Sequence, residues 1–95
     1  MERAFEEGVT NPVGSFTTRG ATARRIQTTD DAVREFNLGT TSGAKPNFVS
    51  TLEATAPVKA KIGFVEGGGK NAIQIVIDPA DRVLLKEVGR RPLGQ

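Results

Sequence analysis

Three consecutive glycines followed by a lysine are the local feature best suited to contacting a ligand. The run comprises Gly67, Gly68 and Gly69, with Lys70 directly after it. Glycine lets a backbone approach a ligand closely, and successive amides in a positive-φ conformation can point at an anion. The run is not a Walker loop, because the spacing and the Lys-Ser/Thr pair are missing. It therefore has two interpretations, an anion-binding loop or a mobile connection between two strands.

One glutamine interrupts the most apolar segment of the chain, residues 72–77. In a strand, Gln74 shares a face with Ala72 and Val76, whereas the three isoleucines of the segment share the other face. A buried amide without a hydrogen-bond partner costs about 1–3 kcal/mol. Gln74 therefore either faces solvent or belongs to a functional site.

The cationic side chains fall into three groups along the sequence. The first group follows the hydroxyl residues Thr17 and Thr18, the second alternates along one strand, and the third lies near the C-terminal end. Guanidinium groups bind phosphate through paired hydrogen bonds, and a neighbouring hydroxyl adds a contact. The members are Arg19, Arg24 and Arg25; Lys59 and Lys61; and Arg90 and Arg91. Each group alone is typical of a solvated surface, but gathered around one concavity they would suit a nucleic-acid backbone.

The composition excludes several kinds of site. The 95 residues include no cysteine and no histidine, which leaves no disulfide, no thiolate metal site and no Ser-His or Cys-His pair. No acidic pair has the spacing of a metal site or a glycosidase, so we expect neither a metal nor a cofactor. Glu53 and Glu66 flank a predicted strand pair and are the candidate bases. A net charge of +2 and a pI of about 9.4 fit either solubility or an anionic partner.

The first half of the chain is predicted to hold the helices. Residues 1–8 are expected to form a helical turn that Gly8 ends. The clearest helix spans residues 30–38, because a threonine before it can serve as the cap and two aspartates occupy its first turn. Gly39 is predicted to end this helix.

The second half changes to the period of β-strands. The pattern predicts strands over residues 48–54, 58–64, 72–77 and 82–88, after a short strand at 16–18. This order indicates an α+β fold, with short N-terminal helical segments packed on a four- to five-stranded, mostly antiparallel sheet. The length predicts one small domain over the whole chain. No apolar run reaches bilayer length and no segment resembles a signal peptide, so we expect no membrane anchor and no targeting signal in this chain.

The order of these motifs resembles that of the C-terminal toxin domains of bacterial polymorphic and contact-dependent growth inhibition systems. The resemblance covers roughly residues 12–93. It rests on residues 14–18 (GSFTT), a short helix ending at Leu38-Gly39, a Val/Thr strand, the glycine run with Gln74, and a closing strand before residues 91–93 (RPL).

Two branches of these toxins are relevant. The compact ribonucleases of barnase, colicin and RelE-like fold pack a helical N-terminal part on a four- or five-stranded antiparallel sheet. The NAD-consuming group, glycohydrolases and ADP-ribosyltransferases, has a Gly-rich run followed by Gln at the nicotinamide site. In this chain four residues separate Gly69 from Gln74, more than that pattern normally has, and the arginine strand that opens the NAD group is not visible. The size and basic pI favour the ribonuclease branch.

The ribonuclease branch implies attack of a ribose 2′-hydroxyl on the adjacent phosphate of tRNA or another RNA, without a metal. Such an enzyme supplies a base, a cation for the crowded phosphate and an acid for the leaving oxygen. The resemblance implies that Thr17 or Thr18 positions the phosphate, and that Glu66 or Glu53 is the base. The other implied catalytic residues are Arg19, Lys59, Lys61, Lys70 and Gln74. The implied substrate-binding residues are Arg24, Arg25, Gly67, Gly68, Gly69, Lys70, Arg90 and Arg91.

The resemblance also implies partners and a destination. Such toxins are delivered into the cytoplasm of a target bacterium, and an immunity protein, expected to be acidic, covers the site. RNA is the implied substrate in one branch and NAD in the other. A third alternative comes from a different class, a non-enzymatic structural or interaction module such as a virion decoration protein, which the glycine and threonine content also fits.

Overall fold

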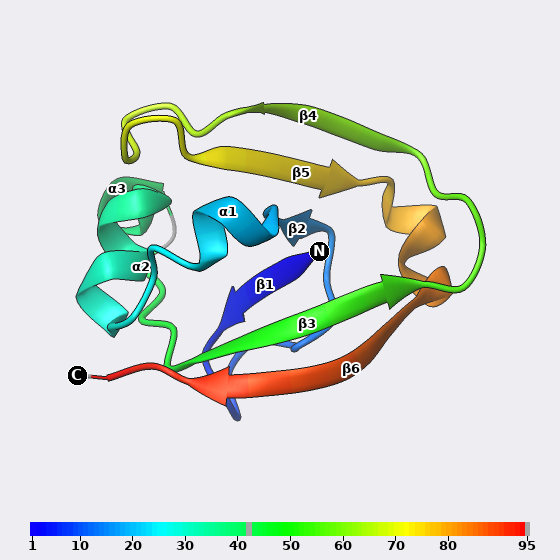
Figure 1. Cartoon of the computed structure of the whole chain (residues 1–95), viewed down its shortest axis with the longest axis horizontal. Coiled ribbons are helices and arrows are strands. Elements are labelled where there is room, and N and C mark those ends of the chain that lie inside the picture. Colours follow the sequence, from blue (N-terminus) through cyan, green and yellow to red (C-terminus); the bar gives the residue numbers. More distant parts are fainter. Residues whose placement is uncertain (42, 95) are drawn as a thin grey trace.

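The protein folds into two three-stranded antiparallel sheets in a computed structural model that describes residues 1–41 and 43–94 (Figure 1). The strands of the first sheet are β1 (Glu2–Phe5), β3 (Phe48–Ala54) and β6 (Leu85–Pro92), in the order β1-β3-β6. Those of the second sheet are β2 (Phe16–Thr17), β5 (Ile73–Ile77) and β4 (Ala60–Phe64), in the order β2-β5-β4. The predicted α+β fold with mostly antiparallel strands is confirmed, and the strands are divided between two sheets.

An antiparallel bridge joins the two sheets. The Glu2 amide donates to the Thr18 carbonyl at 2.9 Å, and the Thr18 amide donates to the Glu2 carbonyl at 2.7 Å. Beyond this pair β1 and β2 separate. The Arg3 guanidinium lies between them, with Nε donating to the Asn11 carbonyl and Nη1 to the Phe16 carbonyl, both at 2.9 Å. The six strands therefore follow the order β6-β3-β1-β2-β5-β4 in a sheet that is split at its centre.

Glycine at position 14 makes room for the guanidinium in this split. A Cβ atom at Gly14 would lie 2.6 Å from Cζ of Arg3, which is closer than nonbonded atoms pack. Any larger residue at this position would therefore push Arg3 out of the gap. The first residue of the GSFTT motif thus has a packing role.

The N-terminal segment is a strand, so the expected helical turn over residues 1–8 is wrong. Phe5 pairs with Phe48 across β1 and β3, and the two rings stack with their centroids 5.8 Å apart. Phe5 is only 2% exposed. Burial of such a side chain contributes about 1.5–3 kcal/mol, which outweighs the small helix preference of the alanine and glutamates around it. Gly8 does lie in a turn after the strand, at a φ of 82°.

The helices are short, namely α1 (Gly20–Ala23), α2 (Thr29–Glu35), α3 (Leu38–Thr41) and the 3-10 helix η1 (Pro79–Leu84). α2 and α3 lie at one end of the sheets, η1 at the other, and α1 between β1 and β5 (Figure 1). The predicted central helix corresponds to α2, and Thr28 is its cap. Thr28 Oγ1 accepts from the Asp31 amide at 3.0 Å, and Asp31 Oδ2 accepts from the Thr28 amide at 3.1 Å. This reciprocal pair is a capping box, which explains why the helix begins where the sequence predicts.

Two predicted boundaries are wrong. The central helix ends earlier than predicted, because Asn37 adopts a left-handed φ of 52° and Gly39 then lies inside α3. The first half of the predicted strand 82–88 is helical, because Asp78 caps η1 by accepting a hydrogen bond from the Ala80 amide at 3.0 Å. β6 therefore begins only at Leu85.

Buried apolar side chains form two clusters, one beside the α-helices and one beside η1. The first contains Ile26, Ala32, Val49 and Leu93, with Ala4 and Phe36 packed against it. The second contains Leu52, Ile77 and Leu85, with the partly buried Met1, Val13, Val58 and Ile75. The second cluster joins the two sheets, whereas the first packs the helical segments against the sheet of β1, β3 and β6. In the described part of the chain, no helix has both the length and the apolar character needed to cross a membrane.

Asp31 links the stability of this fold to pH. The Gln27 amide, the Thr28 amide and hydroxyl, and Arg34 lower the pKa of its carboxyl, with the Gln27 hydrogen bond contributing most. A carboxyl with a depressed pKa stabilises the folded state above its unfolded-state pKa of about 3.9, and this contribution is lost as pH falls through the folded-state pKa. We therefore expect the melting-temperature difference between wild type and Asp31→Asn to shrink between about pH 7 and about pH 3.

Asp30→Asn is the matched control for this thermal unfolding series. Asp30 occupies the same helical turn, is exposed, and accepts no side-chain hydrogen bond from the described residues. The melting-temperature difference between wild type and Asp30→Asn should vary much less with pH. If the melting-temperature difference between wild type and Asp31→Asn stays constant over the same pH range, the prediction is wrong.

Candidate functional site

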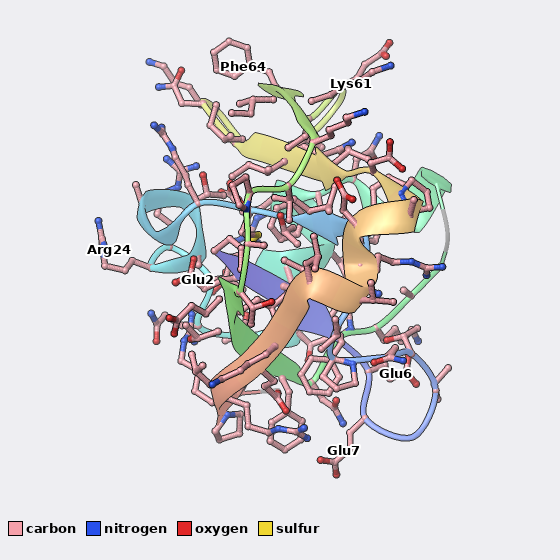
Figure 2. The ribbon with its side chains drawn as sticks, turned by 90° about the vertical axis from the view of Figure 1, so that its right-hand side faces the viewer. Glu2, Glu6, Glu7, Arg24, Lys61 and Phe64 are labelled. Carbon is pink, nitrogen blue, oxygen red and sulfur yellow. The ribbon has the colours of Figure 1, made fainter. Side chains whose placement is uncertain are left out.

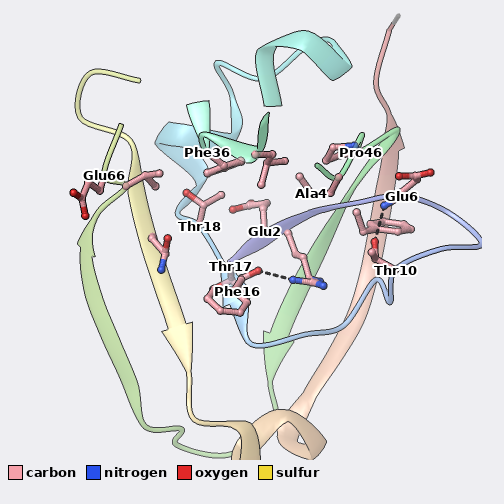
Figure 3. A pocket seen from close by; sticks show the side chains of 16 residues that line it. Glu2, Ala4, Glu6, Thr10, Phe16, Thr17, Thr18, Phe36, Pro46 and Glu66 are labelled. Atoms are coloured by element: carbon pink, nitrogen blue, oxygen red, sulfur yellow. Dashed lines mark hydrogen bonds between the residues drawn. The ribbon is translucent and has the colours of Figure 1, made fainter. Parts of the chain in front are cut away.

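A cleft of about 600 Å³ lies where the two sheets separate (Figure 3). Its polar lining residues are Glu2, Arg3, Glu6, Thr10, Thr17, Thr18, Glu66 and Gln74. Aromatic and aliphatic side chains cover the rest, including Phe5, Phe16, Phe36, Leu38 and Val65. Four of the site residues predicted from sequence therefore line one cleft, namely Thr17, Thr18, Glu66 and Gln74.

Three polar residues form a row across the middle of the split sheet. Glu2 pairs with Thr18 at the bridge between β1 and β2. The register of β2 and β5 pairs Thr17 with Ile75, and its continuation places Thr18 opposite Gln74. Directly opposed residues on adjacent strands project to the same face, with their Cβ atoms about 4.5–5.5 Å apart. Glu2, Thr18 and Gln74 are thus consecutive neighbours on the cleft side of three strands.

The two threonines hold the strand that carries the glutamine. Thr17 Oγ1 donates to the Ile75 carbonyl at 2.8 Å, and Thr18 Oγ1 donates to the Ile73 carbonyl at 2.6 Å. These carbonyls flank Gln74 on either side. Both threonines are buried, and their hydroxyl protons are used within the protein. The threonines therefore position β5 against β2.

Gln74 is the polar group of this row best placed to meet a ligand. Its side chain is half-buried and lines the cleft. The side-chain amide makes no hydrogen bond to any residue that the structure describes. One acceptor oxygen and two N–H donors are therefore available to a ligand. Gln74 lines the cleft, and the interpretation that it belongs to a functional site stays a prediction.

The glycine run is packed against α2. A Cβ atom at Gly68 would lie 2.2 Å from the Glu35 carbonyl oxygen, and one at Gly69 would lie 2.4 Å from the carboxyl carbon of the same residue. The Gly69 amide also donates to the Glu35 carbonyl at 3.1 Å. Gly67 has a φ of 70° and approaches the Asn37 side chain. The run is therefore a docked connection between β4 and β5.

Two of the predicted substrate-binding arginines make internal contacts. Arg91 Nη2 donates to the carbonyls of Ala23 and Ile26, both at 2.7 Å, and so ties β6 to the end of α1. Arg90 pairs with Glu87, and its guanidinium lies 5.2 Å from the centroid of a phenylalanine ring. Arg91 thus has a packing role that its place near the C-terminal end of the sequence did not suggest.

The three cationic groups do not gather at the cleft. Lys61 lies on β4 and Arg90 on β6, which are the two outer strands of the split sheet. Figure 2 shows Arg24 and Lys61 on separate parts of the surface. Arg25 pairs with Glu35 at 3.2 Å. The exposed cations Arg19, Arg24, Lys59, Lys61 and Lys70 are all absent from the described cleft lining.

Arg3 is the cation at the cleft, and the sequence interpretation missed it. Burial lowers the pKa of Arg3, and the positive charge of Arg82 lowers it further. Its Nε and Nη1 are used in the split, and Nη2 has no hydrogen bond to the described residues. The signal for a strand around Arg3 was weak in the sequence. Over only four residues, the alternation of a strand cannot be distinguished from the pattern of a helical turn.

Among residues 1–41 and 43–94, no group of three or more acidic side chains is arranged to hold a metal ion. Comparisons with models of protein families, with curated proteins and with solved structures found no match. Function is therefore inferred from the chemistry of the cleft.

Proposed function

We propose that this chain is an NAD-consuming toxin domain, which breaks the bond between nicotinamide and ribose by hydrolysis or by ADP-ribosyl transfer. One observation carries this proposal. Gln74, which follows the glycine run, and Arg3, on the first strand, line the same cleft in the split sheet. The resemblance to the NAD-consuming toxins implies a Gln after a Gly-rich run and an arginine on an opening strand, and Gln74 and Arg3 are the candidates for these two positions.

The cleft has the properties of a small-ligand site. Its volume of about 600 Å³ lies within the range of roughly 300–1,000 Å³ typical of ligand pockets. Phe16 and Phe36 offer apolar surface for a planar ring, and Arg3 provides a positive charge for an anionic dinucleotide. The amide of Gln74 can pair with the carboxamide of nicotinamide, because each group has both a donor and an acceptor. Gln74 then orients the leaving group and does not transfer a proton.

RNA cleavage receives less support from the same geometry. A polyanion needs several cations around one concavity, because its binding is largely electrostatic. The predicted cations lie on β4, on β6 and near α1, and two of the arginines are used in ion pairs. The ribonuclease prediction nevertheless stays open to experiment. In either branch the proposal includes delivery into a target bacterium and an acidic immunity protein that covers the cleft.

The test is to incubate the purified chain with NAD and, in parallel, with total tRNA. Nicotinamide release is followed by chromatography and tRNA integrity by gel electrophoresis. We expect nicotinamide to be released while tRNA stays intact. Loss of tRNA with NAD unchanged would support the ribonuclease branch. If both substrates survive micromolar protein for hours, the non-enzymatic module is favoured and the proposal fails.

A further inference from the structure

One side of β4 has no partner strand in the described part of the chain (Figure 1). Two hydrogen bonds just beyond its ends show which way its backbone groups point. The Val65 amide donates to the Ala72 carbonyl at 2.9 Å, and the Asp78 amide donates to the Lys59 carbonyl at 2.8 Å. Hydrogen-bonded and non-hydrogen-bonded pairs alternate along an antiparallel ladder. The odd-numbered residues of β4 therefore direct their backbone groups toward β5, and the even-numbered residues direct theirs toward solvent.

The residues with outward-pointing backbone groups also carry exposed apolar side chains. They are Ala60, Ile62 and Phe64. The side chains of Ile62 and Phe64 are each 72% exposed, and they share a face of the sheet with Ile75 and Ile73. Figure 2 shows Phe64 at the outer end of the molecule. An edge strand with unpaired backbone groups and exposed apolar side chains is a template for pairing with another strand.

The opposite outer strand, β6, is protected against such pairing. Charged side chains and proline on an edge strand hinder the approach of another strand. The residues of this kind on β6 are Lys86, Glu87, Arg90, Arg91 and Pro92. Within residues 60–64, by contrast, Lys61 is the only charged residue. The two outer edges of the split sheet thus differ, and β4 is the edge that suits strand pairing.

We infer that β4 is a dimerisation edge, which pairs with β4 of a second copy of this chain in an antiparallel arrangement centred on Ile62. The outward-pointing groups form a hydrogen-bonded ladder only when even-numbered residues face even-numbered residues. With Ile62 opposite Ile62 of the second copy, Ala60 lies opposite Phe64, so that a small side chain meets a large one. The whole length of β4 is then paired. This inference does not depend on the proposed function.

The charge of Lys61 favours this register over its neighbours. In the arrangement centred on Ile62, Lys61 lies opposite Gly63 of the second copy, where no atom would come within 4 Å of an added Cβ atom. The lysine side chain therefore has room. Centring the pair on Lys61 would place two like charges directly opposite each other, which is destabilising. Centring it on Gly63 would place Ala60 opposite Glu66, beyond the end of the strand.

Sedimentation equilibrium tests the dimer, with protein from about 10 µM to about 1 mM. Two edges of five residues bury less than the roughly 1,200–2,000 Å² of a stable interface, so we expect a weak, concentration-dependent dimer. Ile62→Lys places like charges at the centre of the pair and should raise the dissociation constant by about tenfold or more. Val83→Lys is the matched control, because Val83 lies on η1 and is 86% exposed, and it should dimerise like the wild type.

Two results of this measurement overturn the inference. One is a wild type that stays monomeric at the highest concentration, which would leave the edge of β4 to a strand of a different protein. The other is an Ile62→Lys variant that dimerises as tightly as the wild type, which would place the interface elsewhere on the molecule.

Single cysteine substitutions test the register, because the chain contains no cysteine of its own. The Cα atoms of a hydrogen-bonded pair lie about 5.5 Å apart, within the range of about 4.4–6.8 Å that a disulfide spans. Ile62→Cys should therefore form a covalent dimer on mild oxidation. Phe64→Cys should not, because its counterpart lies four residues along the strand, about 14 Å away. Equal yields of covalent dimer from the two variants overturn the proposed register.

Discussion

Replacement of Gln74 by alanine is expected to lower the rate of nicotinamide release by about 100-fold, with no loss of thermal stability. Removal of one well-placed hydrogen-bonding group from an active site typically lowers kcat by about 10²–10³-fold. The stability should not change, because the side-chain amide is not bonded to any described part of the fold. A combined measurement of kcat and melting temperature tests both halves of this expectation.

Lys61→Ala is the control that also separates the two enzymatic alternatives. Lys61 pairs with Val76 across β4 and β5, is exposed, and is absent from the described cleft lining. It should leave NAD consumption unchanged, whereas a ribonuclease that uses this lysine would lose activity on RNA. Wild-type nicotinamide release by Gln74→Ala would contradict the assignment of the glutamine.

Replacement of Gly68 by alanine is expected to destabilise the protein by about 2 kcal/mol or more. The added Cβ atom would lie 2.2 Å from the Glu35 carbonyl oxygen, so the β4–β5 connection must move away from α2. Overpacking of this kind typically costs about 1–3 kcal/mol. For a domain of this size, 1 kcal/mol lowers the melting temperature by about 4–8 °C. A decrease of roughly 10 °C is therefore expected in a thermal unfolding scan.

Gly63→Ala provides the comparison for this second substitution. Gly63 lies on β4, and no atom would come within 4 Å of a Cβ atom added there. An exposed substitution without such a clash usually changes stability by less than about 0.5 kcal/mol. Equal melting temperatures for Gly68→Ala and Gly63→Ala would contradict the docked arrangement of the glycine run. They would favour the mobile connection that the sequence also allows.

Local sequence patterns predicted the helices and strands that depend on interactions between residues close together in the sequence. The strand predicted over residues 48–54 coincides with β3, and the apolar segment 72–77 contains β5. The capping threonine and first-turn aspartates located the start of α2, because capping involves residues only three positions apart. The polarity of Gln74 within an apolar strand was a sufficient signal for a candidate site. The face of β5 on which Gln74 lies follows from the alternation of side chains along a strand, and this alternation can be read directly from a sequence.

The tertiary structure alone decided which cations meet the cleft. Arg3 reaches the cleft because β1 pairs with β3 and is bridged to the residue after β2, and both of these partners are distant in the sequence. A four-residue segment carries too little periodicity to predict that pairing. The three basic groups appear equivalent in the sequence, yet the strand order places β4 and β6 at opposite outer edges. The charge of a side chain is a property of its residue type. Whether several cations gather at one cleft depends on contacts between segments that are distant in the sequence, and only the folded chain determines those contacts.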